Sequence, residues 1–169
     1  MDHTIICFDE AAFRLVPVYR KRWFFKGEKP RAIFWWCNKK LNVFGALIDG
    51  HELFYDFFDA QNSITFKAFL SRLFETLDEN KKYVFILDNA SWHKTDVIKK
   101  YLAKNENVKV EYLPPYSPEL NPIETIWKIT RANETNSRFY ENLDVLQEAL
   151  ENYWTKNNFM LNVSNYLCR

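Results

Sequence analysis

The stretch YLPPYSPELNPIETIW, from Tyr112 to Trp127, changes character halfway along and sets how the chain around it must fold. It holds four of the six prolines in this chain of 169 residues. Each proline fixes φ and removes a backbone donor, so the part before Pro122 is predicted to be a stiff, non-helical arm. Asn121 suits a helix N-cap and Pro122 suits the first helical position, which predicts a helix with Glu124 in its first turn.

Glu124 has two interpretations. In the first, it closes a capping box with Asn121 and serves the helix end alone. In the second, it is a functional carboxylate, and the acids upstream favour this interpretation. The run Tyr83–Asn89 places Asp88 after five apolar residues that read as a buried central strand, and the first apolar run likewise ends in Asp9. Because open α/β sheets bind ligands at the carboxyl ends of strands, we expect both acids at such an edge.

Two strands that end in Asp and a helix that opens with Glu can bring three carboxylates to one point. Such a cluster repels itself unless a cation is present. Mg²⁺ prefers hard oxygen ligands, and one or two ions can hold a phosphodiester for in-line attack. The sequence therefore predicts a metal-dependent site made by Asp9, Asp88 and Glu124.

Three motifs make the chain resemble the catalytic domain of mariner-type DDE transposases, and above all their insertion-sequence branch. The motifs are Phe8–Glu10, the run Leu87–His93 (LDNASWH) and the run Leu113–Trp127. The third is highly specific, and the resemblance covers roughly residues 4–150. It implies that Asp9, Asp88 and Glu124 are the catalytic residues and the ligands of Mg²⁺ or Mn²⁺.

The fold that the resemblance implies is the α/β RNase H-like fold, a mixed five-stranded sheet with helices on both faces. In that fold the strands that carry Asp9 and Asp88 are neighbours. The implied reaction is hydrolysis of a DNA phosphodiester, after which the freed 3′-hydroxyl attacks target DNA. The sequence offers no convincing Ser–His or Cys–His arrangement, which fits in-line attack without a covalent protein intermediate.

Four residues near the acids are expected to support the site. Glu10 would point to the opposite strand face from Asp9, so we expect it to make a supporting contact or an ion pair. Asn89 either supports the site or merely turns the chain. His93 matches a family position, where it would touch a phosphate or orient a water, although a plain polar helix start explains it equally well. Asn121 is the fourth residue that we expect to support the site.

Hydrophobic periodicity predicts the remaining elements. Strands are expected at residues 4–9, 33–37, 42–48, 53–57, 83–88 and 108–112. Helices are expected from residue 63, from residue 95, from residue 122 to about 131, and from residue 142. Gly45, inside a strand, indicates a bulge or a close approach, and Trp127 is expected to pack beneath the site. This order favours a mixed sheet covered by helices.

Composition argues against several classes of protein. The chain has only three glycines, which argues against a glycine-rich phosphate loop, and its three cysteines lack the paired spacing of a zinc site. We interpret them as reduced thiols. No apolar stretch has membrane length and no signal peptide is apparent, so we expect a soluble, cytoplasmic, nucleoid-associated protein.

Although the net charge is only +1, residues 20–40 form a basic block that contains eight Lys or Arg and a single acid, Glu28. The eight are Arg20, Lys21, Arg22, Lys26, Lys29, Arg31, Lys39 and Lys40. Aromatic residues are interleaved with them, which suits contacts with a nucleic-acid backbone and its bases. The alternative is a hairpin whose aromatic face is core and whose basic side chains are merely solvated.

We expect residues 1–169 to form a single catalytic domain. Relatives normally carry a helix-turn-helix region before the first catalytic Asp, whereas this chain begins almost at Asp9. Either the chain is a fragment of a longer protein, or a separate N-terminal DNA-binding chain supplies this region, or the element is decayed. The expected partners are transposon ends, target DNA and further copies of the chain. Two alternatives remain: an RNase H-like nuclease without strand transfer, and a non-catalytic DNA-binding remnant that modulates an intact transposase.

Overall fold

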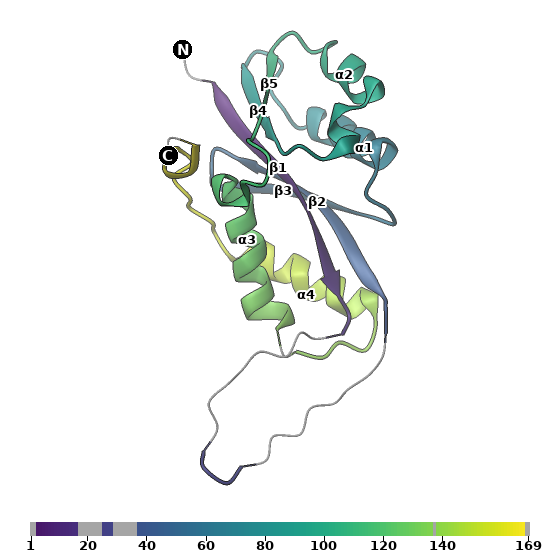
Figure 1. Cartoon of the computed structure of the whole chain (residues 1–169), viewed down its shortest axis with the longest axis vertical. Helices are drawn as coiled ribbons and strands as arrows, with labels where there is room; N and C mark the ends of the chain where they lie inside the picture. Colours follow the sequence, from purple (N-terminus) through teal and green to yellow (C-terminus); the bar gives the residue numbers. More distant parts are fainter. Residues whose placement is uncertain (1–2, 17–24, 29–36, 137, 168–169) are drawn as a thin grey trace.

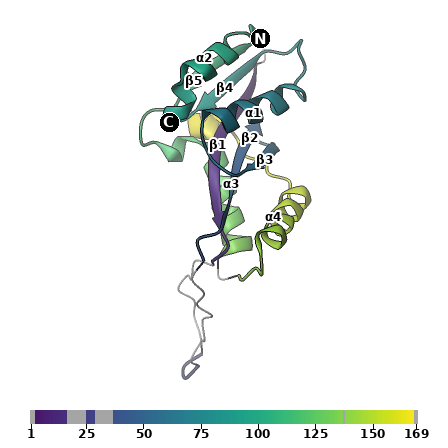
Figure 2. The same ribbon diagram turned by 90° about the vertical axis from the view of Figure 1, so that its right-hand side faces the viewer.

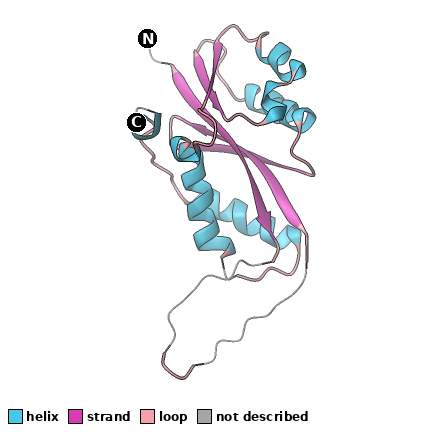
Figure 3. Cartoon of the chain, in the orientation of Figure 1, coloured by secondary structure: helices cyan, strands magenta, loops and turns pink. Residues whose placement is uncertain are grey.

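Five strands form one mixed sheet in the computed structural model, which describes residues 3–16, 25–28, 37–136 and 138–167 (Figures 1 and 3). The strands are β1 (Thr4–Arg14), β2 (Lys40–Ile48), β3 (Glu52–Phe58), β4 (Tyr83–Leu87) and β5 (Val108–Tyr112). Their order across the sheet is β3-β2-β1-β4-β5. The first three pair antiparallel, while β4 runs parallel to both β1 and β5. The predicted mixed five-stranded sheet is confirmed, with β1 and β4 as neighbours.

Among the described residues, the first four helices start within one residue of their predicted positions, whereas the fifth was not predicted. The helices are α1 (Ser63–Phe74), α2 (Asp96–Leu102), α3 (Pro122–Thr130), α4 (Leu143–Lys156) and α5 (Ser164–Leu167). Three short turns accompany them: the 3-10 turns Ser91–Lys94 and Pro118–Leu120, and a π-helical turn at Arg131–Thr135 that continues α3. Asn62 and Asn142 cap α1 and α4 through their side chains, which explains why both helices start where they do.

Strand β1 separates two hydrophobic cores, because its side chains alternate between the faces of the sheet. Ile6 and Phe8 pack with α1 and α2 in one core. Cys7, Ala11 and Phe13 pack with α3 and α4 in the other. The two helix pairs lie toward opposite ends of the molecule in both views (Figures 1 and 2). Consecutive apolar residues of β1, such as Ile6 and Cys7, therefore belong to different cores.

The prediction that β1 ends at Asp9 is wrong. The strand continues to Arg14, because β2 pairs with it in unbroken register as far as Arg14 opposite Lys40. Asp9 is thus a mid-strand residue, and its exposure to a cavity depends on where β4 stops beside it. The predicted strand at residues 33–37 lies outside the described residues except for Cys37, which is in no strand.

Gly45 confirms the predicted close approach of two segments. It sits opposite Asp9 in the β1–β2 pairing, so a side chain there would point to the same face as Asp9. A Cβ at this position would lie 2.5 Å from Cζ2 of Trp127 and 2.9 Å from Cδ1 of Ile123. Both partners are fully buried residues of α3. The missing side chain thus lets α3 lie directly on the sheet beside Asp9.

Within the described ranges, the structure contains no helix that is both long enough and apolar enough to cross a lipid bilayer.

Gly45→Ala should lower the free energy of unfolding by about 1–3 kcal/mol, the usual cost of overpacking a filled core. Denaturant unfolding of the two proteins measures the difference. The double variant Gly45→Ala/Trp127→Phe is the matched control, because phenylalanine lacks the indole atoms that the new methyl group would meet. It should be more stable than the sum of the two single changes predicts. Strictly additive effects would contradict the close approach.

Candidate active site

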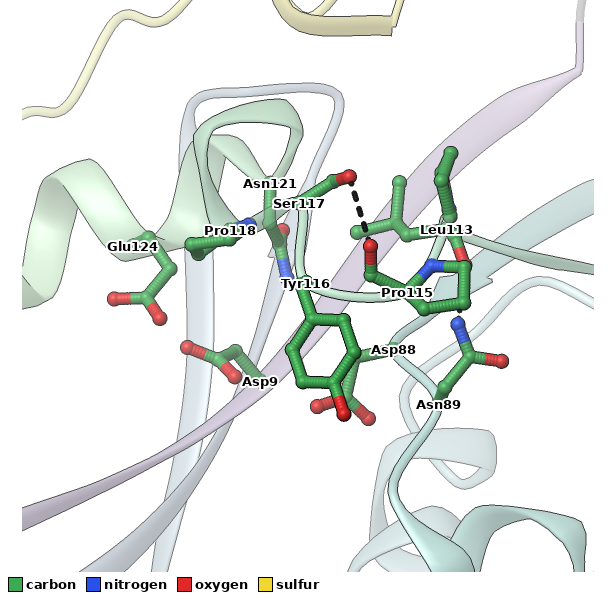
Figure 4. A pocket seen from close by; sticks show the side chains of 11 residues that line it. Asp9, Asp88, Asn89, Leu113, Pro115, Tyr116, Ser117, Pro118, Asn121 and Glu124 are labelled. Atoms are coloured by element: carbon green, nitrogen blue, oxygen red, sulfur yellow. Dashed lines mark hydrogen bonds between the residues drawn. The ribbon is translucent and has the colours of Figure 1, made fainter.

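Asp9, Asp88 and Glu124 line one cavity of about 400 Å³, although they lie far apart in the sequence. Asp9 comes from the middle of β1, Asp88 follows the last residue of β4, and Glu124 lies in the first turn of α3. Figure 4 shows the carboxylates of Glu124 and Asp9 turned toward one another, with Asp88 beyond Asp9. The structure therefore brings together the three acids that the sequence singles out.

The start of α3 is held against β1 by Asn121. Its amide Nδ2 donates a hydrogen bond of 2.8 Å to the carbonyl oxygen of Phe8, the residue before Asp9. Asn121 makes no side-chain capping bond to its own helix, so the capping-box interpretation of Glu124 is not what the structure shows. The predicted supporting residue thus fixes the helix that carries one acid to the strand that carries another.

The surroundings of Asp9 disfavour the charged form of its carboxyl group. Its side chain is buried, and its Oδ2 has no hydrogen-bond partner among the described residues. Burial raises the pKa of Asp9 well above its usual range, and the charges of Glu124, Glu10 and Asp88 raise it further. An unpaired carboxylate oxygen that faces other carboxylates is what a bound cation would satisfy, so the donor set fits a hard divalent metal ion.

Asp88 has the opposite electrostatic environment. Partial burial acts to raise its pKa, but the side chain of His93 and the backbone N–H of Ala90 outweigh this and lower the pKa. Ala90 donates a hydrogen bond of 2.8 Å to Asp88 Oδ1. Asp88 therefore stays ionised at neutral pH while Asp9 resists ionisation, so the two neighbouring acids are not equivalent.

His93 is fully buried between two carboxylates. Its Nε2 lies 2.7 Å from Glu10 Oε1, and its Nδ1 lies 2.8 Å from Asp88 Oδ1 in an ion pair rather than an aligned hydrogen bond. The indole Nε1 of Trp92 donates to the same Glu10 oxygen at 3.1 Å. Burial acts to lower the pKa of His93, but the Asp88 and Glu10 carboxylates raise it to about 9. The predicted ion pair of Glu10 is present, and its partner is His93.

Glu10, Asp88 and His93 also offer one possible metal ligand each, all within 4.8 Å of one another. The two imidazole nitrogens, however, face different carboxylates, so the ring itself fills the space between them. A cation could enter only by displacing the imidazole. We therefore interpret this second group as a set of ion pairs.

The side chain of Asn89 makes hydrogen bonds through both of its polar atoms. The amide of Asn89 donates to the carbonyl oxygen of Leu113 and its Oδ1 accepts from Lys94, so it ties β4 to the proline-rich arm.

Of the predicted DNA-binding residues, the exposed side chains of Lys26, Lys39 and Lys40 belong to described segments. The other five lie outside the described residues: Arg20, Lys21, Arg22, Lys29 and Arg31.

Three residues that were not predicted from the sequence line the acidic cavity or the one beside it. Tyr116 is fully exposed, has a positive φ of 57° that is uncommon for a tyrosine, and lines the acidic cavity. Lys128 and Arg131 line a second cavity of about 740 Å³, which shares Glu124 with the first. They lie four and seven positions after Glu124, and this spacing could have shown that they follow it along one helix face.

Asp9→Asn should stabilise the metal-free protein near pH 7, because it removes a charge that burial and three acids oppose. A carboxyl group whose folded pKa is raised binds more protons in the folded state. Its destabilising effect therefore appears as pH rises above its unfolded pKa of about 4 and is complete above the raised folded value. The stability difference between variant and wild type should thus grow from pH 4 upward, as thermal unfolding in a chelating buffer would measure. A difference independent of pH would contradict this electrostatic account.

Comparison with known proteins gives the family. The family model for DDE superfamily endonucleases matches residues 4–147. An uncharacterized protein of Sinorhizobium fredii, y4pE/y4sA, is 33% identical over 87 residues, which are 52% of this chain and 62% of that protein. The uncharacterized 39 kDa protein of insertion element IS630 from Shigella sonnei is 29% identical over 142 residues, 80% of this chain and 41% of that protein. The chain thus spans less than two thirds of either relative.

Solved structures agree on the fold. A paired-end complex of Mos1 transposase with the left transposon end superposes with a TM-score of 0.76 at 16% identity, covering 97% of this chain and 50% of that chain. The isolated catalytic domain of the Mos1 mariner transposase gives a TM-score of 0.65 at 16% identity, covering 97% of this chain and 74% of that domain. With most of its length matched by the family model and its acids gathered in one cavity, the chain belongs to the DDE superfamily of endonucleases.

Proposed function

We propose that this chain is the catalytic domain of a transposase, which cleaves a DNA phosphodiester with Mg²⁺ or Mn²⁺ and then transfers the freed strand to target DNA. The observation that carries the proposal is the meeting of Asp9, Asp88 and Glu124 in one cavity of a DDE-family fold. Structures of Mos1 paired-end complexes with Mn and with Mg support the choice of metal. We propose that the protein cleaves and joins DNA in the cytoplasm, at the nucleoid.

The acids divide the task of holding a metal and a phosphate. A divalent ion bound there would polarise the scissile phosphate and lower the pKa of an attacking water or 3′-hydroxyl. Asp9 supplies a buried oxygen with no partner among the described residues, and Asp88 supplies a carboxylate that is ionised at neutral pH. Glu124 comes from a helix start that Asn121 ties to β1 at Phe8, next to Asp9, so the fold holds Glu124 near Asp9.

Asp88→Asn and Glu124→Gln should each abolish metal-dependent nicking of supercoiled plasmid DNA. Each change removes a negative ligand and leaves a side chain of the same shape, so far-ultraviolet circular dichroism should be unchanged. Glu148→Gln is the matched control, because Glu148 is an exposed carboxylate of α4, away from the cavity. It should nick DNA at the wild-type rate. Full nicking by both active-site variants would mean that the cavity is not catalytic.

Nicking and joining assays on the wild-type protein distinguish the transposase from the two alternative functions. Joining of a pre-cleaved transposon end to a target plasmid supports a transposase. Nicking without joining favours a nuclease, and binding without either reaction favours a remnant that modulates another transposase. The intact set of three acids in one cavity favours the enzymatic alternatives.

A groove beside the acidic cavity offers a path for the DNA backbone. The cavity lined by Lys128 and Arg131 runs from Pro118 and Glu119, before α3, past Glu124 and along the helix to Asn136, after the π-helical turn. The Lys128 side chain is exposed, and the Arg131 guanidinium lies 5.3 Å from the centre of the Phe13 ring. Two cations that follow the acids along one groove suit the phosphates that flank a scissile bond.

The double variant Lys128→Gln/Arg131→Gln should weaken binding to all DNA duplexes alike. The slope of log K against log salt should shrink by about 0.9 for each phosphate that the protein no longer neutralises, while sequence preference stays the same. Lys99→Gln/Lys100→Gln on α2 is the control, since these exposed lysines belong to the helix pair on the opposite face of the sheet. Equal reductions in affinity in both double variants would argue against binding that is specific to the groove.

Assembly into a larger complex is also proposed. Among the similar structures are a Mos1 strand transfer complex and Mos1 paired-end complexes. We propose by extension that two copies of this chain act together on two transposon ends. We also propose that end recognition requires a further DNA-binding region, encoded in the same protein or in a separate chain, while residues 1–169 supply a single catalytic domain.

A further inference from the structure

We propose that Glu10 and His93 are positioning residues, which hold Asp88 so that one of its oxygens is presented to the metal. The proposal rests on the proposed function of the three-acid cavity and adds a second group of residues on the other face of β1. Its basis is the row of contacts that runs from Trp92 and Glu10 through His93 to Asp88.

The first step is the alternation of β1. Asp9 and Glu10 are consecutive, so their side chains leave the strand on opposite faces. Asp9 lines the acidic cavity beside α3, while Glu10 turns toward the core of α1 and α2. There it meets His93, whose ring centre lies 4.4 Å from that of Phe66. Asp9 thus lines the proposed metal site directly, whereas its neighbour Glu10 contacts it only through His93 and Asp88.

The second step is the burial of the intermediate residue. The side chain of His93 is 0% exposed and that of Glu10 is 7% exposed, whereas that of Asp88 is 42% exposed. A buried carboxylate is costly unless it is paired, and Glu10 is paired with both His93 and Trp92. Because packing against Phe66 and the contact with Glu10 hold the imidazole, it can fix the more exposed carboxylate of Asp88 in turn.

The third step concerns the two oxygens of Asp88. Both the Ala90 N–H and His93 Nδ1 lie 2.8 Å from Oδ1. This leaves Oδ2 as the oxygen available to a cation. Groups that orient a metal ligand in this way typically change metal affinity by about 10–100-fold when they are altered. We therefore expect His93 to act on metal binding through Asp88, without touching the metal or the DNA.

Two amide substitutions at position 93 separate positioning from mere stability. The amide nitrogen of asparagine falls near the place of Nδ1, so His93→Asn keeps a donor for Asp88 and removes the partner of Glu10. Glutamine reaches the place of Nε2, so His93→Gln keeps a partner for Glu10 and removes the one that faces Asp88. Each variant keeps one of the two carboxylate partners, so each is the stability control for the other.

The experiment is a Mn²⁺ titration of each folded variant at low temperature, without DNA, with free Mn²⁺ read by electron paramagnetic resonance. His93→Gln should bind Mn²⁺ about 10–100-fold more weakly than wild type, and His93→Asn should stay within a few-fold of wild type. Thermal unfolding without metal should be similar for the two. Equal Mn²⁺ affinity in His93→Gln and wild type would overturn the proposal and leave His93 a purely structural residue.

Glu10→Gln is the second variant, should His93→Gln fail to fold. It keeps an acceptor for Trp92 but weakens the hold on His93, so Mn²⁺ affinity should fall by a smaller, measurable factor. Unchanged affinity in this variant would overturn the role of Glu10. Wild-type protein that binds no Mn²⁺ would overturn the proposed function itself. Binding that is abolished in Asp9→Asn but unaffected at positions 10 and 93 would overturn only the positioning role.

Discussion

The site depends on how closely α3 can lie against the sheet. Gly45 stands opposite Asp9, and the rings and methyl groups of α3 occupy the space that a side chain would take. Asn121 then fixes the first turn of the same helix to the backbone of β1 through Phe8. A glycine on one strand and an amide on the helix therefore set the separation between Asp9 and Glu124. We expect that removing either feature would let Glu124 move away from Asp9.

Strand β1 serves the site from both of its faces. Its central position in the sheet gives it antiparallel pairing with β2 on one side and parallel pairing with β4 on the other, so its backbone has little freedom to shift. The strand β4 ends at Leu87, which opens the cavity at Asp88 while β1 continues beneath it. This difference in strand length explains how a buried, mid-strand Asp9 can face a cavity at all.

Much of this arrangement could be predicted because its determinants are local. The apolar run before Asp88 and the Asn-Pro start of α3 each define an element and an acid within a few residues. The end of β1 was predicted wrongly, since its length depends on pairing with β2, which no pattern inside β1 reveals. The place of His93 could not be derived either. Its hydrogen bond with Glu10 joins residues 83 positions apart, and only the folded sheet determines that the two meet.

The two aspartates illustrate how a fold can hold several acids close together. Asp88 is stabilised in its charged form by His93 and Ala90, whereas burial and neighbouring acids oppose the charge of Asp9. The charge of His93 lies between Glu10 and Asp88, so the two carboxylates share one cation. In the metal-free protein Asp9 therefore bears repulsion from Glu124, Glu10 and Asp88 together. Because a divalent cation bound in the cavity would relieve that repulsion, metal binding is expected to stabilise the folded protein.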